Sequence, residues 1–291
     1  MRGNETGAAP DRLRAPRGVW GEFGYLEDPS GPSLVYLYED GAGSEAQARF
    51  TRVAKFVEDL RARVGAGRPR IDVHGFELVD APSAVGDFWC EEEVRGTYYP
   101  ELQELALELT GGRRAYVFDH LCRRREAGRP PLTFGRAGDG SHPAAVGRVH
   151  NDYSERSGAS RLGKVICGEH ERRSSDAYCI VNVWRPIVGP IVDTPLALCD
   201  AATVHARNMH ACEIRYPERN GEIAVFTDSP RHRWSYASEM RATEALVFKQ
   251  YDSRVNGVPR FVPHAAFDLP LRDDDAPLRQ SIEARCLVTF D

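Results

Sequence analysis

A histidine and an aspartate stand two residues apart at His150 and Asp152, a spacing that suits metal binding. On a β-strand, such residues project from the same face, so an imidazole nitrogen and a carboxylate oxygen can reach one cation. A second histidine from a neighbouring strand would complete a facial triad with open coordination positions. With nine histidines in the chain, about one such triplet is expected by chance. Its place in the short apolar run VGRVHNDY, after a glycine-rich stretch, is what favours a metal site.

Four further histidines are candidates for the third metal ligand: His205, His210, His232 and His264. His264 is favoured because it follows the strand-like run ALVFKQYDS and precedes the basic run LRQSIEARCLVTF. This order is typical of iron oxygenases built on a jelly roll. His232, in SPRHRWSY, is the rival candidate, and its other interpretation is a surface or supporting histidine beside Trp234.

Two arginines near the end of the sequence, Arg279 and Arg285, are candidates for holding the carboxylate of a co-substrate. Arginine suits this role because its guanidinium pairs with a carboxylate through two hydrogen bonds. Arg285 lies inside the apolar run SIEARCLVTF, where an unpaired charge would be costly. An ion pair with Glu283, on the same strand face, is an equally good interpretation. Arg279 stands at the start of the same run, where it could instead be solvated.

The elements that must position these residues are mostly short strands. Apolar runs bounded by Gly, Pro, Asp or Asn recur after residue 147, and 34–38, 71–79 and 114–125 also have strand patterns. The spacing predicts a helix over 91–109, ending at Gly111–Gly112, and another over 158–171. It favours a helix over 45–64, with a strand as the alternative. The glycine-rich stretch 126–147 is the best candidate for a mobile loop. Together these patterns predict a mostly β fold with flanking helices, in the form of a double-stranded β-helix, a cupin-like jelly roll.

Composition excludes several classes of protein. The net charge of −5 gives no reason to expect nucleic-acid binding, and no run approaches the roughly 18 apolar residues of a membrane span. The seven cysteines form no C-x-x-C pair, which is typical of a reducing, cytoplasmic location. Residues 1–18 lack an apolar signal segment and are expected to be a flexible arm. Residues 19–291 are expected to form one oxygenase domain, because nothing indicates a second.

Several longer segments of the sequence resemble the CmcJ/AsaB-type hydroxylase and desaturase family, which includes gibberellin desaturase-like proteins. The resemblance covers about residues 70–290, with the motifs in the expected order. They include GFELVDAPSAVGDFWCEEEVRGTYYPELQELALELTG, VFDHLCRRR, VHNDYSERSGASRL, NVWRPIVGPIVDTPLALCDA, HRWSYASEMRATEALVFKQYDS and RFVPHAAFDLP. The stretch 126–147 is longer and richer in glycine than the family pattern, and the first residues have no counterpart in it.

The resemblance implies a non-haem iron(II) oxygenase that uses 2-oxoglutarate and dioxygen on a small molecule of secondary metabolism, such as antibiotic biosynthesis. It implies metal ligands at His150, Asp152 and His264, and a basic last strand carrying Arg279 and Arg285. No catalytic residue is expected beyond this metal centre. Candidate substrate-binding residues are Arg161, Asn182, Trp184, Arg185, His232 and Lys249, each of which could instead be structural.

Three other functions are compatible with the same residues. An iron(II) oxidase of this fold would turn over without 2-oxoglutarate, and a zinc hydrolase or lyase would work without oxygen. A metal-free binding protein is disfavoured because all three ligand residues are present. Hydroxylation, desaturation and oxidative cyclisation remain open as reactions. A homodimer is an expectation with no residue pattern behind it.

Overall fold

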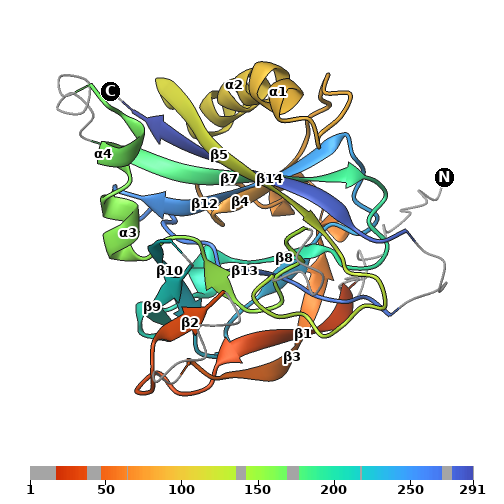
Figure 1. Cartoon of the computed structure of the whole chain (residues 1–291), viewed down its shortest axis with the longest axis vertical. Helices are drawn as coiled ribbons and strands as arrows, with labels where there is room; N and C mark the ends of the chain where they lie inside the picture. Colours follow the sequence, from red (N-terminus) through yellow and green to blue (C-terminus); the bar gives the residue numbers. More distant parts are fainter. Residues whose placement is uncertain are drawn as a thin grey trace, which may run out of the picture.

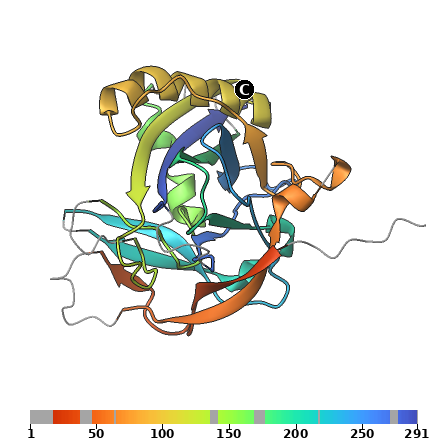
Figure 2. The same cartoon turned by 90° about the vertical axis from the view of Figure 1, so that its right-hand side faces the viewer.

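The computed structural model describes residues 18–37, 47–63, 65–135, 142–168, 177–216, 218–270 and 277–290. Two β-sheets face each other across a common interior, and a helical layer covers the outer face of the smaller sheet (Figure 1). The view turned by 90° shows the same three layers, with the larger sheet farthest from the helices (Figure 2). The predicted double-stranded β-helix, a jelly roll, is confirmed. No helix among these residues is long and apolar enough to cross a membrane.

The small sheet has five strands in the order β4-β12-β7-β14-β5, all paired antiparallel. Their bounds are β4 Phe76–Asp80, β5 Arg114–Arg124, β7 Tyr178–Val188, β12 Glu244–Asp252 and β14 Gln280–Thr289. Because side chains alternate along a strand, one face of this sheet points toward the helices and the other toward the large sheet. Only the second face can contribute to a site between the sheets.

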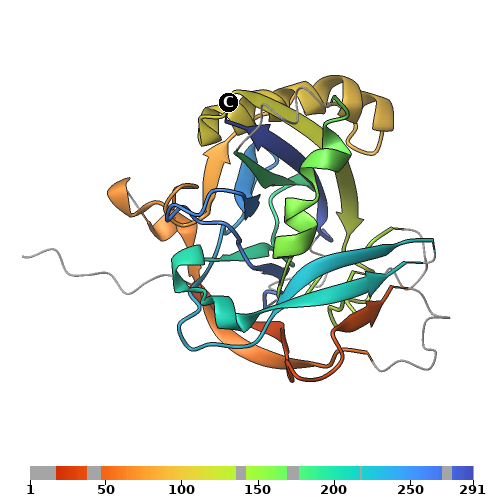
Figure 3. The same ribbon diagram turned by 90° about the vertical axis from the view of Figure 1, so that its left-hand side faces the viewer.

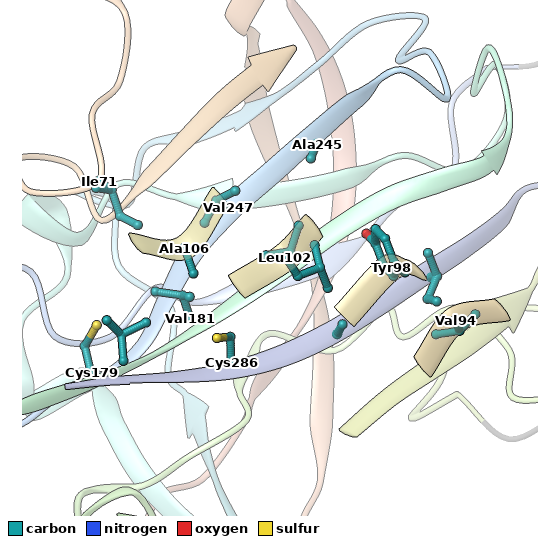
Figure 4. Packing of buried hydrophobic residues seen from close by; sticks show 14 of the residues in the cluster. Ile71, Val94, Tyr98, Leu102, Ala106, Cys179, Val181, Ala245, Val247 and Cys286 are labelled. Atoms are coloured by element: carbon teal, nitrogen blue, oxygen red, sulfur yellow. The ribbon is translucent and has the colours of Figure 1, made fainter. Parts of the chain in front are cut away.

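A helical segment packs on the outer face of the small sheet. It consists of α1 Glu91–Glu93, a π-helical stretch η4 Val94–Tyr98 and α2 Tyr99–Thr110. Val94, Tyr98 and Leu102 lie at helical spacing and are buried against strand residues such as Val181 (Figure 4). The helix ends as the sequence predicts, because Gly111 adopts the left-handed conformation (φ 68°) that follows many helix ends.

The large sheet has nine strands in the order β1-β3-β11-β8-β13-β6-β10-β9-β2. Their bounds are β1 Gly18–Leu26, β2 Leu34–Tyr36, β3 Phe50–Asp59, β6 His150–Asn151, β8 Leu196–Cys199, β9 Met209–Arg215, β10 Asn220–Phe226, β11 Trp234–Tyr236 and β13 His264–Ala266. Two short helices, α3 Glu155–Ala159 and α4 Leu162–Val165, follow β6, and α3 contacts strands of both sheets (Figure 3). Four short 3-10 turns complete the described elements: η2 Leu60–Ala62, η3 Gly65–Gly67, η5 Ala201–Thr203 and η6 Ala206–Asn208.

The structure corrects several element predictions. The helix favoured over 45–64 is wrong, since Phe50–Asp59 forms strand β3 paired with β1, in keeping with its threonine, valines and aromatic residues. The helix expected over 158–171 starts earlier and is divided into α3 and α4. Within 71–79 only β4 is a strand, because Ile71–His74 forms a turn. The sequence prediction lacked β1, β9 and β11. Residues 1–17, and 136–141 of the loop expected to be mobile, lie outside the described part of the chain.

Candidate metal centre

Two neighbouring strands of the large sheet bring three possible metal ligands together. His150 on β6 is paired in register with His264 on β13, and their ring centroids are 4.3 Å apart. Asp152 follows two residues after His150, and its Oδ1 lies 3.6 Å from His150 Nε2 and 4.0 Å from His264 Nε2. The three ligand atoms all lie within 4.8 Å of one another. Among the described residues, this is the one group of three or more ligand-type side chains with that geometry.

Both histidines hold the tautomer that a metal ligand needs. His150 Nδ1 lies 2.8 Å from the carbonyl oxygen of Arg148, and His264 Nδ1 lies 3.3 Å from that of Val262. A carbonyl oxygen only accepts, so Nδ1 carries the proton in each ring and the lone pair is left on Nε2. The Nε2 atom of His264 is buried and has no hydrogen-bond partner in the described part of the chain. An orphaned acceptor aimed at a carboxylate oxygen is what a metal site requires.

Burial keeps the two imidazoles neutral. Burial, together with the neighbouring His264, lowers the pKa of His150 to about 4. Burial also lowers the pKa of His264. Neutral imidazole is the form that binds metals, so both rings are ready to act as ligands at neutral pH.

The carboxylate of Asp152 is held by the small sheet from across the interior. Its Oδ2 accepts hydrogen bonds from Asn182 Nδ2 on β7 and from Arg285 Nε on β14, each at 2.8 Å. Its backbone N–H donates to Gln250 Oε1 on β12 at 2.7 Å. Although burial opposes ionisation, Arg285 and the two histidines hold the pKa of Asp152 far below its usual value. With Oδ2 occupied, Oδ1 is the oxygen presented to a metal.

The two arginines predicted as co-substrate anchors have different surroundings. Arg285 binds three carboxylates, because it also donates to Asp119 (2.8 Å) and to Glu283 (3.1 Å). The pair with Glu283, the alternative interpretation at the sequence level, is therefore present. Arg279 is buried, and its Nε and Nη1 donate only to uncharged oxygens, on Ser281 and Thr194. Within the described structure, the guanidinium of Arg279 thus binds no carboxylate, whereas that of Arg285 binds three.

A small cavity connects Arg279 with the histidines. It measures about 20 Å³ and is lined by His150, His264, Arg279, Arg123 and Glu283, together with apolar residues. The indole ring of Trp184 also lines it, and lies 5.0 Å from the guanidinium of Arg279. Burial and the charge of Arg123 lower the pKa of Arg279 to about 9, which leaves it protonated at neutral pH. Burial and the nearby Asp152 raise the pKa of Glu283.

A second, larger cavity reaches the triad at Asp152. It measures about 190 Å³, and Asp152 and Arg285 form part of its wall. Tyr153 lies beside Asp152, and its hydroxyl oxygen accepts from Arg161 Nε and Nη2 at 3.2 and 2.9 Å. Arg161, a predicted substrate-binding residue, therefore lines a cavity that reaches the triad.

Two other predicted substrate-binding residues, Arg185 and Lys249, lie elsewhere in the structure. Arg185 follows Trp184 on β7 and so points to the opposite face, where its guanidinium lies 4.9 Å from the ring of Tyr98. Lys249 is fully buried and donates to Asp252 and Asp72. Neither Arg185 nor Lys249 is among the residues that line the two cavities beside the triad.

His232 belongs to a separate cluster of aromatic residues. Its Nδ1 lies 3.0 Å from the hydroxyl of Tyr25, and the oxygen of that hydroxyl accepts a hydrogen bond from Trp234 Nε1 at 3.0 Å. It contributes nothing to the ligand group, so the structure brings together His264 and not His232.

Sequence reasoning missed several residues around the triad. Most of them lie in strands far from His150 in the sequence, so no spacing links them to it, and Tyr153 has no metal-ligand pattern of its own. The missed residues are Asp119 and Arg123 on β5, Tyr153 after β6, and Gln250 on β12. Arg123 could have been suspected from the run of arginines in LCRRR, but that pattern does not indicate which of them points inward.

Comparison with known proteins identifies the family. Residues 23–289 match the family model described as an oxidoreductase/YMDC permease-like domain. The chain is 29% identical to a hydroxylase/desaturase of Cercospora beticola, CTB9, over 93% of this chain and 86% of the relative. It is 30% identical to the Fe(II)/2-oxoglutarate-dependent dioxygenase nvfI of Aspergillus novofumigatus, over 84% and 86% of the two chains.

A solved structure has the same fold. It is described as the iron and alpha-ketoglutarate-dependent endoperoxidase NvfI, and superposes with a TM-score of 0.81 over 94% of this chain and 98% of that chain, at 24% identity. The chain belongs to the family of iron(II)/2-oxoglutarate-dependent hydroxylases and desaturases, as the resemblance implied. It is therefore an oxidoreductase.

Proposed function

We propose that His150, Asp152 and His264 hold iron(II) in this chain and that the metal serves a 2-oxoglutarate-dependent oxygenase reaction. The observation that carries this proposal is the convergence of three ligand atoms, one of them a buried Nε2 without a hydrogen-bond partner in the described structure. Two histidines and one carboxylate form the ligand set of non-haem iron oxygenases, which leaves open positions on one side of the metal. Iron bound here would supply the activation of dioxygen.

The residues behind Asp152 have a positioning role in this proposal. Asn182 and Arg285 occupy Oδ2, so the carboxylate would bind iron through Oδ1 alone. Partners of this kind fix the orientation of a metal ligand and commonly contribute ten- to a hundredfold to metal affinity. Because Arg285 is engaged with three carboxylates, we assign it to the triad rather than to the co-substrate.

Arg279 is assigned to a carboxylate of 2-oxoglutarate. It lines a cavity that it shares with both metal-binding histidines, and Arg123 adds a second positive charge there. The cavity of about 20 Å³ has room for little more than one water molecule. Binding of a five-carbon diacid therefore requires side chains to move, and the two long arginine side chains are well suited to do so.

The substrate is a small molecule of secondary metabolism, and it would bind in the cavity of about 190 Å³ that reaches the triad at Asp152. The names of the relatives support hydroxylation or desaturation as the reaction, and oxidative cyclisation is a third outcome of the same chemistry. A cytoplasmic location, a homodimer, and one domain over 19–291 are retained as predictions from the sequence.

The test is anaerobic addition of 2-oxoglutarate to the iron(II)-loaded protein, followed by visible absorbance. We expect a weak charge-transfer band in the unmodified protein and its loss in His150→Ala. The matched control is His205→Ala, which removes a surface histidine and should leave the band unchanged.

Two results would contradict the proposal in different ways. Iron binding without a band would favour an oxidase that works without 2-oxoglutarate. No iron binding at all would show that the triad is not the metal site.

A further inference from the structure

The larger cavity beside the triad is lined by three basic side chains that have no ion-pair partner among the described residues. Arg161, Lys164 and Arg219 all line it, and in the described part of the chain none of the three forms an ion pair. Among the residues that the structure describes, the side chain of Arg161 donates only to the neutral hydroxyl of Tyr153, and Arg219 lies 4.1 Å from the ring of Tyr216. The cavity therefore offers three cations to whatever enters it.

The acidic side chains of the same cavity are already engaged. Asp119 accepts from Arg285, and Glu222 accepts from Arg156 and from Ser154. The remaining acid, Asp152, has its Oδ2 bound by Arg285 and Asn182, and its Oδ1 faces the histidines. In the described structure, none of these three carboxylates therefore forms an ion pair with Arg161, Lys164 or Arg219.

Two further features indicate the kind of ligand. The Arg161 guanidinium lies over the rings of Phe118 and Tyr153, at 4.7 and 5.2 Å, so its position is fixed before a ligand arrives. A fixed guanidinium favours a planar, bidentate anion, and carboxylate has that geometry. The aromatic rings of Tyr153 and Tyr216 supply flat apolar surface next to the cations.

We propose that the substrate of this oxygenase carries a carboxylate, which binds Arg161, with Lys164 and Arg219 strengthening the attraction from the rim. This inference rests on the proposed function, because it takes the cavity beside the triad as the substrate site. It adds the chemical class of the substrate, an organic acid with an unsaturated or aromatic body.

The test compares matched pairs of probes, namely benzoate, trans-cinnamate and hexanoate with their primary amides. Binding is measured by calorimetry on the metal-free protein, and again on the anaerobic iron(II) protein saturated with 2-oxoglutarate. We expect the acids to bind about tenfold more tightly than the amides, because a charge-assisted hydrogen bond is lost in each amide. The difference in affinity between acids and amides should become smaller as the ionic strength rises.

Three variants assign the effect to the cavity. Arg161→Gln should remove the preference for acids, and Arg219→Gln together with Lys164→Gln should reduce it. Lys164 and Arg219 are exposed, so this double variant keeps the test valid if Arg161→Gln does not fold. Arg95→Gln makes the same charge change on the helical layer, away from the cavity, and should leave the preference intact.

The outcomes are distinct from those that test the function. Equal binding of acids and amides, or a preference that survives both cavity variants, overturns the inference. The charge-transfer band with 2-oxoglutarate should persist in Arg161→Gln and be weakened in Arg279→Gln. The reverse result would mean that the cavity cations bind the co-substrate, which also overturns it. If the band is missing even in the unmodified protein, the proposed function fails, while the metal-free probe comparison still tests the cavity.

Discussion

This protein has two groups of buried histidines, and the hydrogen bonds around their rings differ in direction. His150 and His264 donate from Nδ1 to backbone carbonyls, so Nε2 carries a lone pair that points at Asp152. In the cluster formed by Tyr25, His232 and Trp234, the indole N–H can only donate, so the Tyr25 hydroxyl accepts it. Among the described residues, His232 Nδ1 is the only hydrogen-bond acceptor that reaches this hydroxyl, so the hydroxyl proton is assigned to that bond. This leaves the proton of His232 on Nε2, with no lone pair for a metal.

The difference shows that the partner of Nδ1 decides what a buried histidine can do. A backbone carbonyl behind the ring makes Nε2 a ligand, whereas a hydroxyl donor behind the ring makes Nε2 a donor. Burial is common to both groups and lowers the pKa of His150 and of His232 to about 4. Burial therefore does not distinguish a metal site from a structural histidine.

The largest expected contrast is in metal binding. His264→Ala removes one of three ligands, and we expect stoichiometric iron(II) binding at micromolar protein to disappear. His232→Ala should still bind one iron(II) per chain, because that ring has no lone pair directed at a metal. Anaerobic calorimetry or competition with a coloured chelator measures both. Retained binding in His264→Ala, or loss confined to His232→Ala, would reverse the assignment of the two groups.

The next contrast concerns the co-substrate. Arg279→Gln should raise the Kd for 2-oxoglutarate on the iron(II) protein about tenfold to a hundredfold, as expected for loss of hydrogen bonds to a charged group. Arg185→Gln is the control, since Arg185 is also buried on the small sheet but faces the helices. Titration with 2-oxoglutarate, followed by the absorbance of the charge-transfer band, measures the Kd of both variants. An unchanged Kd in Arg279→Gln would leave the co-substrate without its assigned anchor.

A smaller effect should follow from removing one hydrogen bond behind each histidine group. Asn182→Ala takes a donor from Asp152 and should lower iron(II) affinity about tenfold. Tyr25→Phe leaves the Trp234 N–H without its acceptor, and should lower the free energy of unfolding by about 1–3 kcal/mol. It should leave iron affinity as it is. Chelator competition and urea unfolding together test this pair, and an iron-affinity change in Tyr25→Phe would disprove the separation.

The smallest expected effect is a pH dependence of stability. The folded protein holds His232 neutral down to about pH 4, whereas the unfolded chain protonates it near pH 6.5. The unfolded state thus binds more protons between these values, so stability falls as pH falls through this window and is fully present above it. Because the ring is partly screened by solvent, its share is on the order of 1 kcal/mol. Urea unfolding of the metal-free protein at pH 4.5 and 7.5 measures this effect. The free energy of unfolding should fall less between pH 7.5 and 4.5 in His232→Gln than in the unmodified protein. An identical loss in both proteins would contradict this origin.

Much of the architecture was predictable from local patterns. Short apolar runs between turn residues predicted the strands that now form β7, β12 and β14, and the helix over 91–109 is present with its glycine end. The strand β3 was only the alternative prediction for its segment, because its spacing of apolar residues also suits a helix and only pairing with β1 selects the extended form. The same limit applies to β9 and β11, whose existence depends on neighbours distant in the sequence.

The sequence by itself determined the family, the strand-rich class and the pairing of His150 with Asp152, since alternation along one strand needs no other part of the chain. Only the tertiary structure decided that His264 joins them and His232 does not, because this depends on β13 lying beside β6. The tertiary structure also gave different surroundings to Arg285 on β14 and to Arg279, the residue just before that strand. Arg285 meets Asp152 across the interior, whereas in the described structure the side chain of Arg279 donates only to uncharged oxygens. Such differences arise from contacts between strands far apart in the chain, and a local pattern of residues carries no information about those contacts.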